Sequence, residues 1–219
     1  MFQNRQEAGR LLADSSDLRK YKGRGDVVVL SIPRGGVVIG SEIARILKVS
    51  LSAIVVKKLG APGNPELAIG AVAPDNIKEI DWELTLRKGV EQDYFDWELK
   101  KKKQEIDRRE KMYGLRDIKF LIKDKKTVIL TDDGVATGAT VLAAIKYIRN
   151  LKNKLGLQSL QIILAIPVIA KDTLERLKCE TDGVTTLEAP KSFGAVGEFY
   201  SEFPQVSDAQ VLNILKSFR

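Results

Sequence analysis

The sequence predicts an α/β fold: a mostly parallel, twisted sheet with helices on both faces. Short apolar runs rich in β-branched residues recur along the chain, and segments with helical spacing of apolar residues lie between them. In such sheets ligands bind outside the carboxyl ends of the strands. The loops that follow the apolar runs are therefore expected to carry the chemistry.

The elements follow in order from these two patterns. Apolar residues at roughly helical spacing predict an opening amphipathic helix over residues 2–13, which would cover the sheet or an oligomer surface. Continuous apolar runs predict strands at residues 27–32, 51–56, 68–73, 127–130, 160–166 and 184–187. Helical patterns follow the first run through Leu47 and recur at about 139–155 and 170–178.

The composition indicates one globular domain over residues 1–219. No Ser/Gly/Pro-rich stretch marks a linker, and the chain is 44% apolar and 30% charged. The first residues lack the apolar core of a signal peptide, and no run reaches the length of a membrane span. We therefore expect a cytoplasmic protein with no membrane partner.

Two residue types limit the chemistry. Cys179 is the single cysteine of the sequence, and histidine is absent, which excludes an internal disulfide, a histidine metal site and a Cys/His catalytic pair. Acid–base chemistry must then use carboxylates, lysines, the substrate or water.

The positive charge is unevenly distributed. The net charge is +7, and the segment 98–126 contains 12 basic against 6 acidic residues. A basic field favours anionic partners, either nucleic acid or a small polyphosphate. A solvated helix face is the commoner explanation of a run such as Lys100–Lys103.

The most informative segment is Val128–Thr140, where an apolar run is followed by two acids, a loop of small residues and a helical pattern. We expect a buried strand that delivers Asp132 and Asp133 to its carboxyl end. The following turn can surround a phosphate with backbone N–H groups and the hydroxyls of Thr137 and Thr140. Paired acids need a metal, hydroxyl donors or water as partners, and vicinal ribose hydroxyls are such donors. The pattern indicates a phosphosugar.

Two other interpretations of this segment compete. A nucleotide P-loop requires G-x-x-x-x-G-K-[ST], but Gly134 and Gly138 are one residue too close, and Ala139 stands in place of the lysine. A strand that ends in a solvated Asp-Asp-Gly turn is the simpler alternative. The Thr-Gly-Ala-Thr that follows favours the phosphate site.

Two other strand ends carry residues suited to anions. After the first strand, Gly35 and Gly36 allow backbone N–H groups to approach an anion, and Arg34 adds a cationic fork. Lys57 and Lys58 follow the second strand. A simple turn and an ordinary solvated strand end would explain the same residues.

Together these segments resemble the phosphoribosyl pyrophosphate (PRPP) signature of the type I phosphoribosyltransferases. The resemblance implies that Asp132 and Asp133 are catalytic and hold the ribose. It assigns the 5′-phosphate to a loop made of Ala136, Thr137, Gly138, Ala139 and Thr140. It assigns the diphosphate to Arg34, Gly35, Gly36, Lys57 and Lys58. Mg²⁺ would be held mainly by PRPP, with no direct protein ligand.

One position departs from part of the family. The 6-oxopurine enzymes usually carry an Asp just before the Thr-Gly, where this chain has Ala136. The departure disfavours hypoxanthine and guanine as acceptors. Adenine, a pyrimidine and a non-nucleobase amine remain open.

The resemblance also implies two additions to the fold. Residues 78–123 would form an inserted helical arm, and residues 190–219 a C-terminal hood in which Phe193, Phe199 and Tyr200 stack an acceptor base. The turn formers of 59–67 predict a loop, of which residues 60–66 would close over the site.

The resemblance covers nearly the whole chain and extends to a subgroup whose acceptor is unassigned. It implies transfer of the phosphoribosyl group from PRPP to a nitrogen acceptor, in particular a nucleobase for nucleotide salvage, by a homodimer. Two alternatives remain: a PRPP- or nucleotide-sensing regulator, and a subunit that needs a catalytic partner. Nucleic acid is disfavoured as a partner because no helix-turn-helix or RNA-binding signature is visible.

Overall fold

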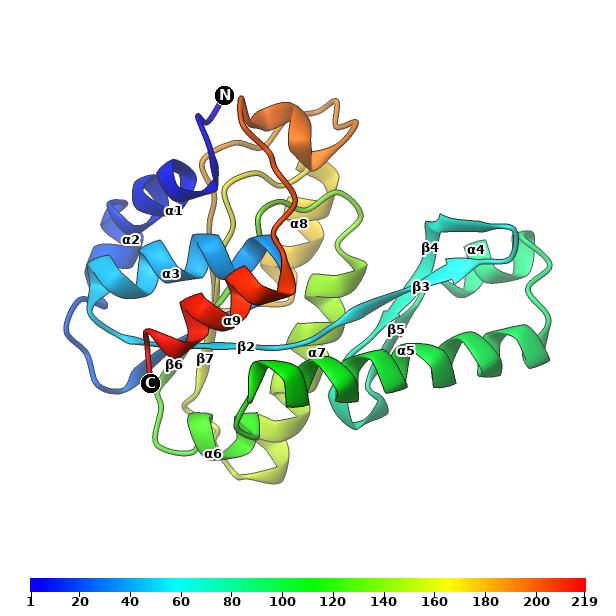
Figure 1. Ribbon diagram of the computed structural model, residues 1–219, viewed down its shortest axis with the longest axis horizontal. Coiled ribbons are helices and arrows are strands. Elements are labelled where there is room, and N and C mark those ends of the chain that lie inside the picture. The colour runs from blue at the N-terminus through cyan, green and yellow to red at the C-terminus, as the bar shows by residue number, and fades with distance from the viewer.

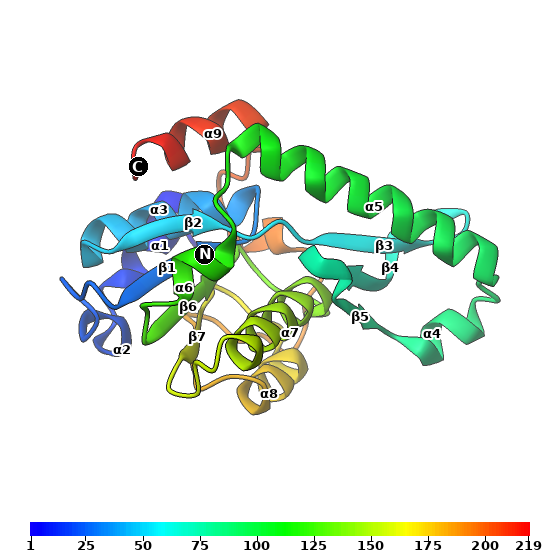
Figure 2. The same ribbon diagram turned by 90° about the horizontal axis from the view of Figure 1, so that it is seen from below.

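A computed structural model describes residues 1–219, the side chain of Glu66 excepted. Its main sheet is parallel throughout, in the order β2-β1-β6-β7-β8. The strands are β1 (Val27–Ser31), β2 (Ser50–Ala53), β6 (Thr127–Thr131), β7 (Gln161–Ala165) and β8 (Gly183–Thr185). The predicted fold class is confirmed, because this sheet is covered by helices on both faces (Figure 2).

Alternate residues of the buried strands divide the interior into two apolar clusters. Val27 and Val29 of β1 join the cluster on one face, and Val28 and Leu30 the other. The first face is covered by α1 (Arg5–Ala13), α3 (Gly35–Leu47) and α9 (Asp208–Lys216), and the second by α7 (Ala139–Lys154) and α8 (Lys171–Cys179). Burial on both faces explains why these strands are continuous apolar runs.

Helix termini follow local sequence signals. Asn4 caps α1 through its side chain, Ser15 caps the short α2 (Ser16–Arg19), and Ser207 forms a capping box with Gln210 at α9. Helix α7 instead begins after Gly138, at φ 81°, and has no side-chain cap. Its first N–H groups therefore remain available to a ligand.

The arm is a second, antiparallel sheet with its own helices, and it extends away from the main sheet (Figure 1). It comprises β3 (Lys57–Ala61), β4 (Asn64–Val72), the turn η1 (Pro74–Asn76), β5 (Lys78–Ile80), α4 (Trp82–Arg87) and α5 (Gln92–Tyr113). The strand predicted at 68–73 exists as part of β4, but it pairs within the arm and not in the main sheet. The arm's sheet begins at Lys57, before the predicted residue 78. Residues 60–66, predicted as a closing loop, lie in the β3–β4 hairpin.

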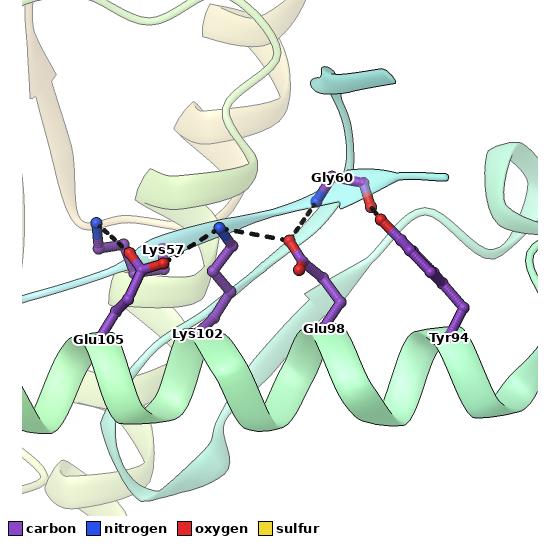
Figure 3. Close-up of polar contacts among 6 residues, drawn as sticks. All are labelled: Lys57, Gly60, Tyr94, Glu98, Lys102 and Glu105. Carbon is purple, nitrogen blue, oxygen red and sulfur yellow. Dashed lines mark hydrogen bonds and ion pairs between the residues drawn. The ribbon is translucent and has the colours of Figure 1, made fainter. Parts of the chain in front are cut away.

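A ladder of polar side chains joins α5 to the edge strand β3 (Figure 3). The Tyr94 hydroxyl donates to the Gly60 carbonyl at 3.1 Å, and the Gly60 N–H donates to Glu98 Oε1 at 3.3 Å. Lys102 Nζ lies 3.4 Å from Glu98, and Lys57 Nζ lies 2.9 Å from Glu105. The two contacts to Gly60 satisfy backbone groups of the edge strand, and the ion pairs fix the side chains beside them.

The C-terminal end of α5, where the arm returns to the core, is joined to the C-terminal helix α9. The buried hydroxyl of Tyr113 donates to Asp208, and burial raises the pKa of Tyr113 to about 12. Arg219 donates to the Gly114 carbonyl at 2.9 Å. From here the chain returns through α6 (Ile118–Ile122) to β6. Among all the helices described, none has the length and apolarity that a membrane span requires.

Candidate functional site

A cavity of about 440 Å³ lies at the carboxyl ends of β1 and β6. Of the predicted site residues, it is lined by Arg34, Gly35, Lys58, Asp132, Asp133, Ala136, Thr137, Gly138 and Thr140. Residues from the segments that follow β1 and β6, together with Lys58 of β3, thus meet at one edge of the sheet. Gly36, Lys57, Ala139, Phe193, Phe199 and Tyr200 are not among the lining residues.

The acid pair follows β6 directly. Asp132 Oδ1 accepts the backbone N–H of Asp133 at 2.9 Å. The pKa of Asp132 is raised, first by burial and then by the charge of Asp133, while Lys58 acts in the opposite direction. A carboxyl group in this environment is stabilised by hydrogen bonds from hydroxyl donors, or by being protonated itself.

Asp133 has a cationic partner that sequence reasoning missed. Arg5 Nε donates to Asp133 Oδ2 at 2.8 Å, with 9% and 17% of the two side chains exposed. Arg5 also donates to the Pro204 carbonyl at 2.8 Å, and its guanidinium lies 3.6 Å from the ring centroid of Phe203. The opening helix therefore orients the second acid, through a contact 128 residues apart in sequence that no local signal indicates.

The loop before α3 lies directly against the acids. A Cβ atom at Gly35 would lie 1.8 Å from Asp133 Oδ2, and one at Gly36 would lie 2.8 Å from Asp132 Cα. The intervening space admits only glycine at both positions. The loop thereby brings Arg34, which follows a cis peptide bond from Pro33, to the cavity.

The loop from Gly134 to Gly138 is held by two neighbours. On one side a Cβ at Gly134 would lie 2.5 Å from Val196 of the hood. On the other, Thr173 Oγ1 of α8 donates to the Ala136 carbonyl at 2.5 Å. The loop leads into the first turn of α7, whose free N–H groups and dipole favour an anion.

The two adjacent lysines differ in their surroundings. Lys58 is exposed and lines the cavity. Lys57 is directed to Glu105 on α5, and its pKa is lowered mainly by burial (Figure 3). Successive side chains of a β-strand point to opposite faces, so β3 directs Lys57 and Lys58 to different sides.

The hood contributes one aromatic residue to the cavity, Phe203, and it is not one of the three predicted. Phe193 and Phe199 contact each other at 5.0 Å between ring centroids. Tyr200 is buried, and its hydroxyl donates to the Asp133 carbonyl at 2.5 Å. The side chains that line the cavity from the hood are instead Val196, Phe203, Gln205 and Val206. The backbone of the hood is irregular, so its sequence has no periodic pattern. Without such a pattern, the sequence could not show which aromatic rings point into the cavity.

Comparison with known proteins identifies the class. The model of the phosphoribosyl transferase domain matches residues 3–201. The chain belongs to the phosphoribosyl transferase family.

Individual relatives agree with this assignment. Two Mycobacterium tuberculosis proteins, from strains H37Rv and CDC 1551, are named provisionally as phosphoribosyl transferases. Each is 34% identical over 215 residues, which is 98% of this chain and 46% of the relative. The chain thus spans about half the length of the curated relatives it matches. The crystal structure of the protein TT1426 from Thermus thermophilus is 34% identical, with a TM-score of 0.72 over 99% of this chain and 98% of that chain.

Proposed function

We propose that this protein transfers the phosphoribosyl group of PRPP to a nitrogen acceptor and releases diphosphate. One observation carries the proposal: the acid pair, the loop before α7, Arg34 and Lys58 all line one cavity. Each group matches one part of PRPP: the ribose hydroxyls, the 5′-phosphate and the diphosphate.

The chain's own residues would act mainly by electrostatics. Glycosyl transfer proceeds through a transition state with oxocarbenium character. Asp132 and Asp133 would accept the ribose hydroxyls and favour the positive charge that develops at the anomeric carbon. Arg5 would keep the Asp133 carboxylate directed at the ribose, because it holds one oxygen and leaves the other free.

The leaving diphosphate would be bound by two cationic residues of the same cavity. Arg34 offers a planar fork of donors, and Lys58 a mobile ammonium group. Backbone N–H groups at the start of α7 would hold the 5′-phosphate. In this arrangement the sugar is fixed at both ends while the bond to diphosphate breaks.

The donor set also suits a magnesium ion that arrives with the substrate. Mg²⁺ is bound in proteins by one or two carboxylates together with substrate phosphates. Asp132 and Asp133, the acids that line the cavity, are assigned to the ribose hydroxyls, and we propose that the ion is held mainly by the phosphates of PRPP. When bound, the ion would supply positive charge to the diphosphate.

The acceptor is proposed to be a planar nitrogen base. Phe203, held under the Arg5 guanidinium, gives the cavity an aromatic wall. Ala136 supplies no acid to share a proton with a 6-oxopurine, so we propose adenine, a pyrimidine or another amine ahead of hypoxanthine and guanine. A cytoplasmic homodimer with a role in nucleotide salvage is part of the same proposal.

Diphosphate release from PRPP and Mg²⁺ tests the proposal. The assay would include adenine, guanine, hypoxanthine, uracil, orotate and no base, with the double variant Asp132→Asn/Asp133→Asn alongside. Release with one base that the double variant abolishes would establish the transferase and name its acceptor. An unimpaired double variant would contradict the assignment of the acids. PRPP binding by calorimetry without release from any base would favour the sensing function, or a catalytic partner.

A further inference from the structure

A second cavity, of about 570 Å³, lies where the arm returns to the main sheet. It is formed by η1, the last turns of α5, the connection 114–117 into α6, Ala53 at the end of β2, and Tyr147 of α7. It shares no lining residue with the proposed PRPP cavity. Its volume is within the range of small-molecule sites.

Negative charge exceeds positive charge on its walls. Asp75, Asp107, Glu110 and Asp117 line it, against Lys111 and Arg116. Asp117 forms an ion pair with Lys119 at 2.8 Å, whereas the other three acids form none with the described side chains. The pKa of Glu110 is raised by burial and then by Asp107, Asp117 and Asp75, as expected where carboxylates lack countercharge.

Tyr147 gives an independent indication of a ligand. Its side chain lines the cavity with only 4% of the residue exposed. Its hydroxyl makes no hydrogen bond to any residue that the structure describes. The pKa of Tyr147 is raised, first by burial and then by the negative charges of Asp75, Asp117 and Glu110. The residue is otherwise buried and its hydroxyl is accessible from the cavity, so a ligand there can donate to it or accept from it.

The arrangement favours an organic cation over a metal ion. No three carboxylates among the described residues converge as metal ligands. They are instead spread over separate segments, with apolar Pro74, Leu115 and Ile118 on the same walls. Spaced ammonium groups joined by methylenes match both features. We propose that this cavity binds a linear aliphatic polyamine, with its ammonium groups at the carboxylates and its methylenes on the apolar side chains.

Such a ligand would connect the arm to the core. Asp75, Asp107 and Glu110 belong to the arm, whereas Asp117, the N-cap of α6, and Tyr147 of α7 belong to the core. A bound polyamine neutralises repulsion across this junction. The arm also carries Lys58 to the PRPP cavity, so the ligand would reduce the motion of one wall of that site.

Calorimetric titration of the full chain with spermidine tests the proposal. We expect saturable binding that Asp75→Asn/Glu110→Gln weakens by about tenfold or more, and that Tyr147→Phe weakens to a smaller extent. Asp75 has φ 55°, a conformation that asparagine also adopts, so the variant should fold. The matched control is Asp172→Asn/Glu175→Gln on α8, which removes two surface charges outside the cavity.

Three results would overturn the proposal. They are the absence of saturable binding, equal weakening by the α8 control, and displacement of spermidine by Mg²⁺ at equal concentration. The first two would indicate non-specific attraction, and the third a divalent site. Since the titration contains neither PRPP nor a base, its outcome does not depend on transferase activity.

Discussion

The parallel-sheet core and the arm are stabilised by different interactions. In the core, β1 and β6 are buried on both faces, between two apolar clusters. The arm has an edge strand joined to α5 by hydrogen bonds and ion pairs, and it leaves Trp82, Leu86 and Trp97 exposed at 59%, 78% and 55%. Apolar burial on both faces of the sheet stabilises the core, whereas the arm combines a smaller set of buried apolar residues, among them Leu59, Ile69 and Phe95, with specific polar contacts.

The same difference extends to the site. The acids, Arg34 and the loop before α7 come from the core, and the arm supplies Lys58. We expect the arm to open locally at a lower free energy than global unfolding, because it has fewer apolar contacts. The core would then keep most of the site preformed while one cation moves with the arm.

Arg5→Ala should have the largest effect on stability. It removes the partner of a buried carboxylate and the contact with Phe203, at a cost of roughly 3 kcal/mol, as when one member of a buried pair is lost. Chemical denaturation would measure this cost. Arg10→Ala, at an exposed position of the same helix, is the control. If both variants lost the same free energy of unfolding, the Arg5–Asp133 contact would contribute nothing specific, and α1 would stabilise the fold only by covering the sheet.

Glu98→Ala should affect the arm alone. It leaves the Gly60 N–H without its acceptor and removes a partner of Lys102, which costs roughly 1–3 kcal/mol locally. Hydrogen exchange should show faster exchange in β3 and β4 and unchanged protection in β1 and β6. Glu105→Ala, farther along the ladder, should have a smaller effect since Glu105 is half-exposed. Uniform loss of protection would show that core and arm unfold together.

The sequence predicted the core better than the arm for a physical reason. Strands buried on both faces must be continuous apolar runs, so 27–32 and 127–130 were located nearly to the residue. The run at 68–73 has the same composition but pairs within the arm, because apolar character does not specify the partner strand. Turn formers at Pro62 and Gly63 predicted a loop where the structure has a tight hairpin, with Gly63 at φ 70°.

The sequence predicted those parts of the candidate site whose residues are close together in the chain. The acids and the loop after them are consecutive, so their chemistry is visible in the sequence. Arg5 reaches Asp133 only through tertiary packing. Likewise, nothing in the local sequence distinguishes Phe203 from Phe199. Only the folded hood shows that Phe203 lines the cavity and Phe199 does not.

The adjacent lysines of β3 allow a direct test of the arm's contribution to the site. Lys58→Met should raise the KM for PRPP about tenfold, equivalent to about 1.4 kcal/mol, because it removes a cation from the cavity. Lys57→Met should change KM much less, since Lys57 is directed to Glu105. Steady-state kinetics on both variants measures the contrast. Equal increases in KM would indicate that Lys57 leaves Glu105 when PRPP binds.

The smallest predicted effect is a gain of stability in the core. Because the pKa of Asp132 is raised in the folded protein, its ionisation opposes folding. The stabilising contribution of the protonated group is complete below the unfolded pKa, about 3.9, and is lost as the pH rises through the folded value. Asp132→Asn keeps the acceptor for the Asp133 N–H and removes the charge. We expect its Tm at pH 7 to exceed that of the unmodified chain by about 2–4 °C, which corresponds to about 1 kcal/mol for this size.

This gain should disappear below about pH 4, where Asp132 is protonated in both states. Thermal unfolding at both pH values measures the difference, and Asp14→Asn on the surface is the control. A variant that gains stability at neutral pH while losing transfer activity would show that the acid pair is retained at a cost to folding. A loss of stability at pH 7 that diminishes in acid would mean that Asp132 is stabilised by its surroundings as a carboxylate.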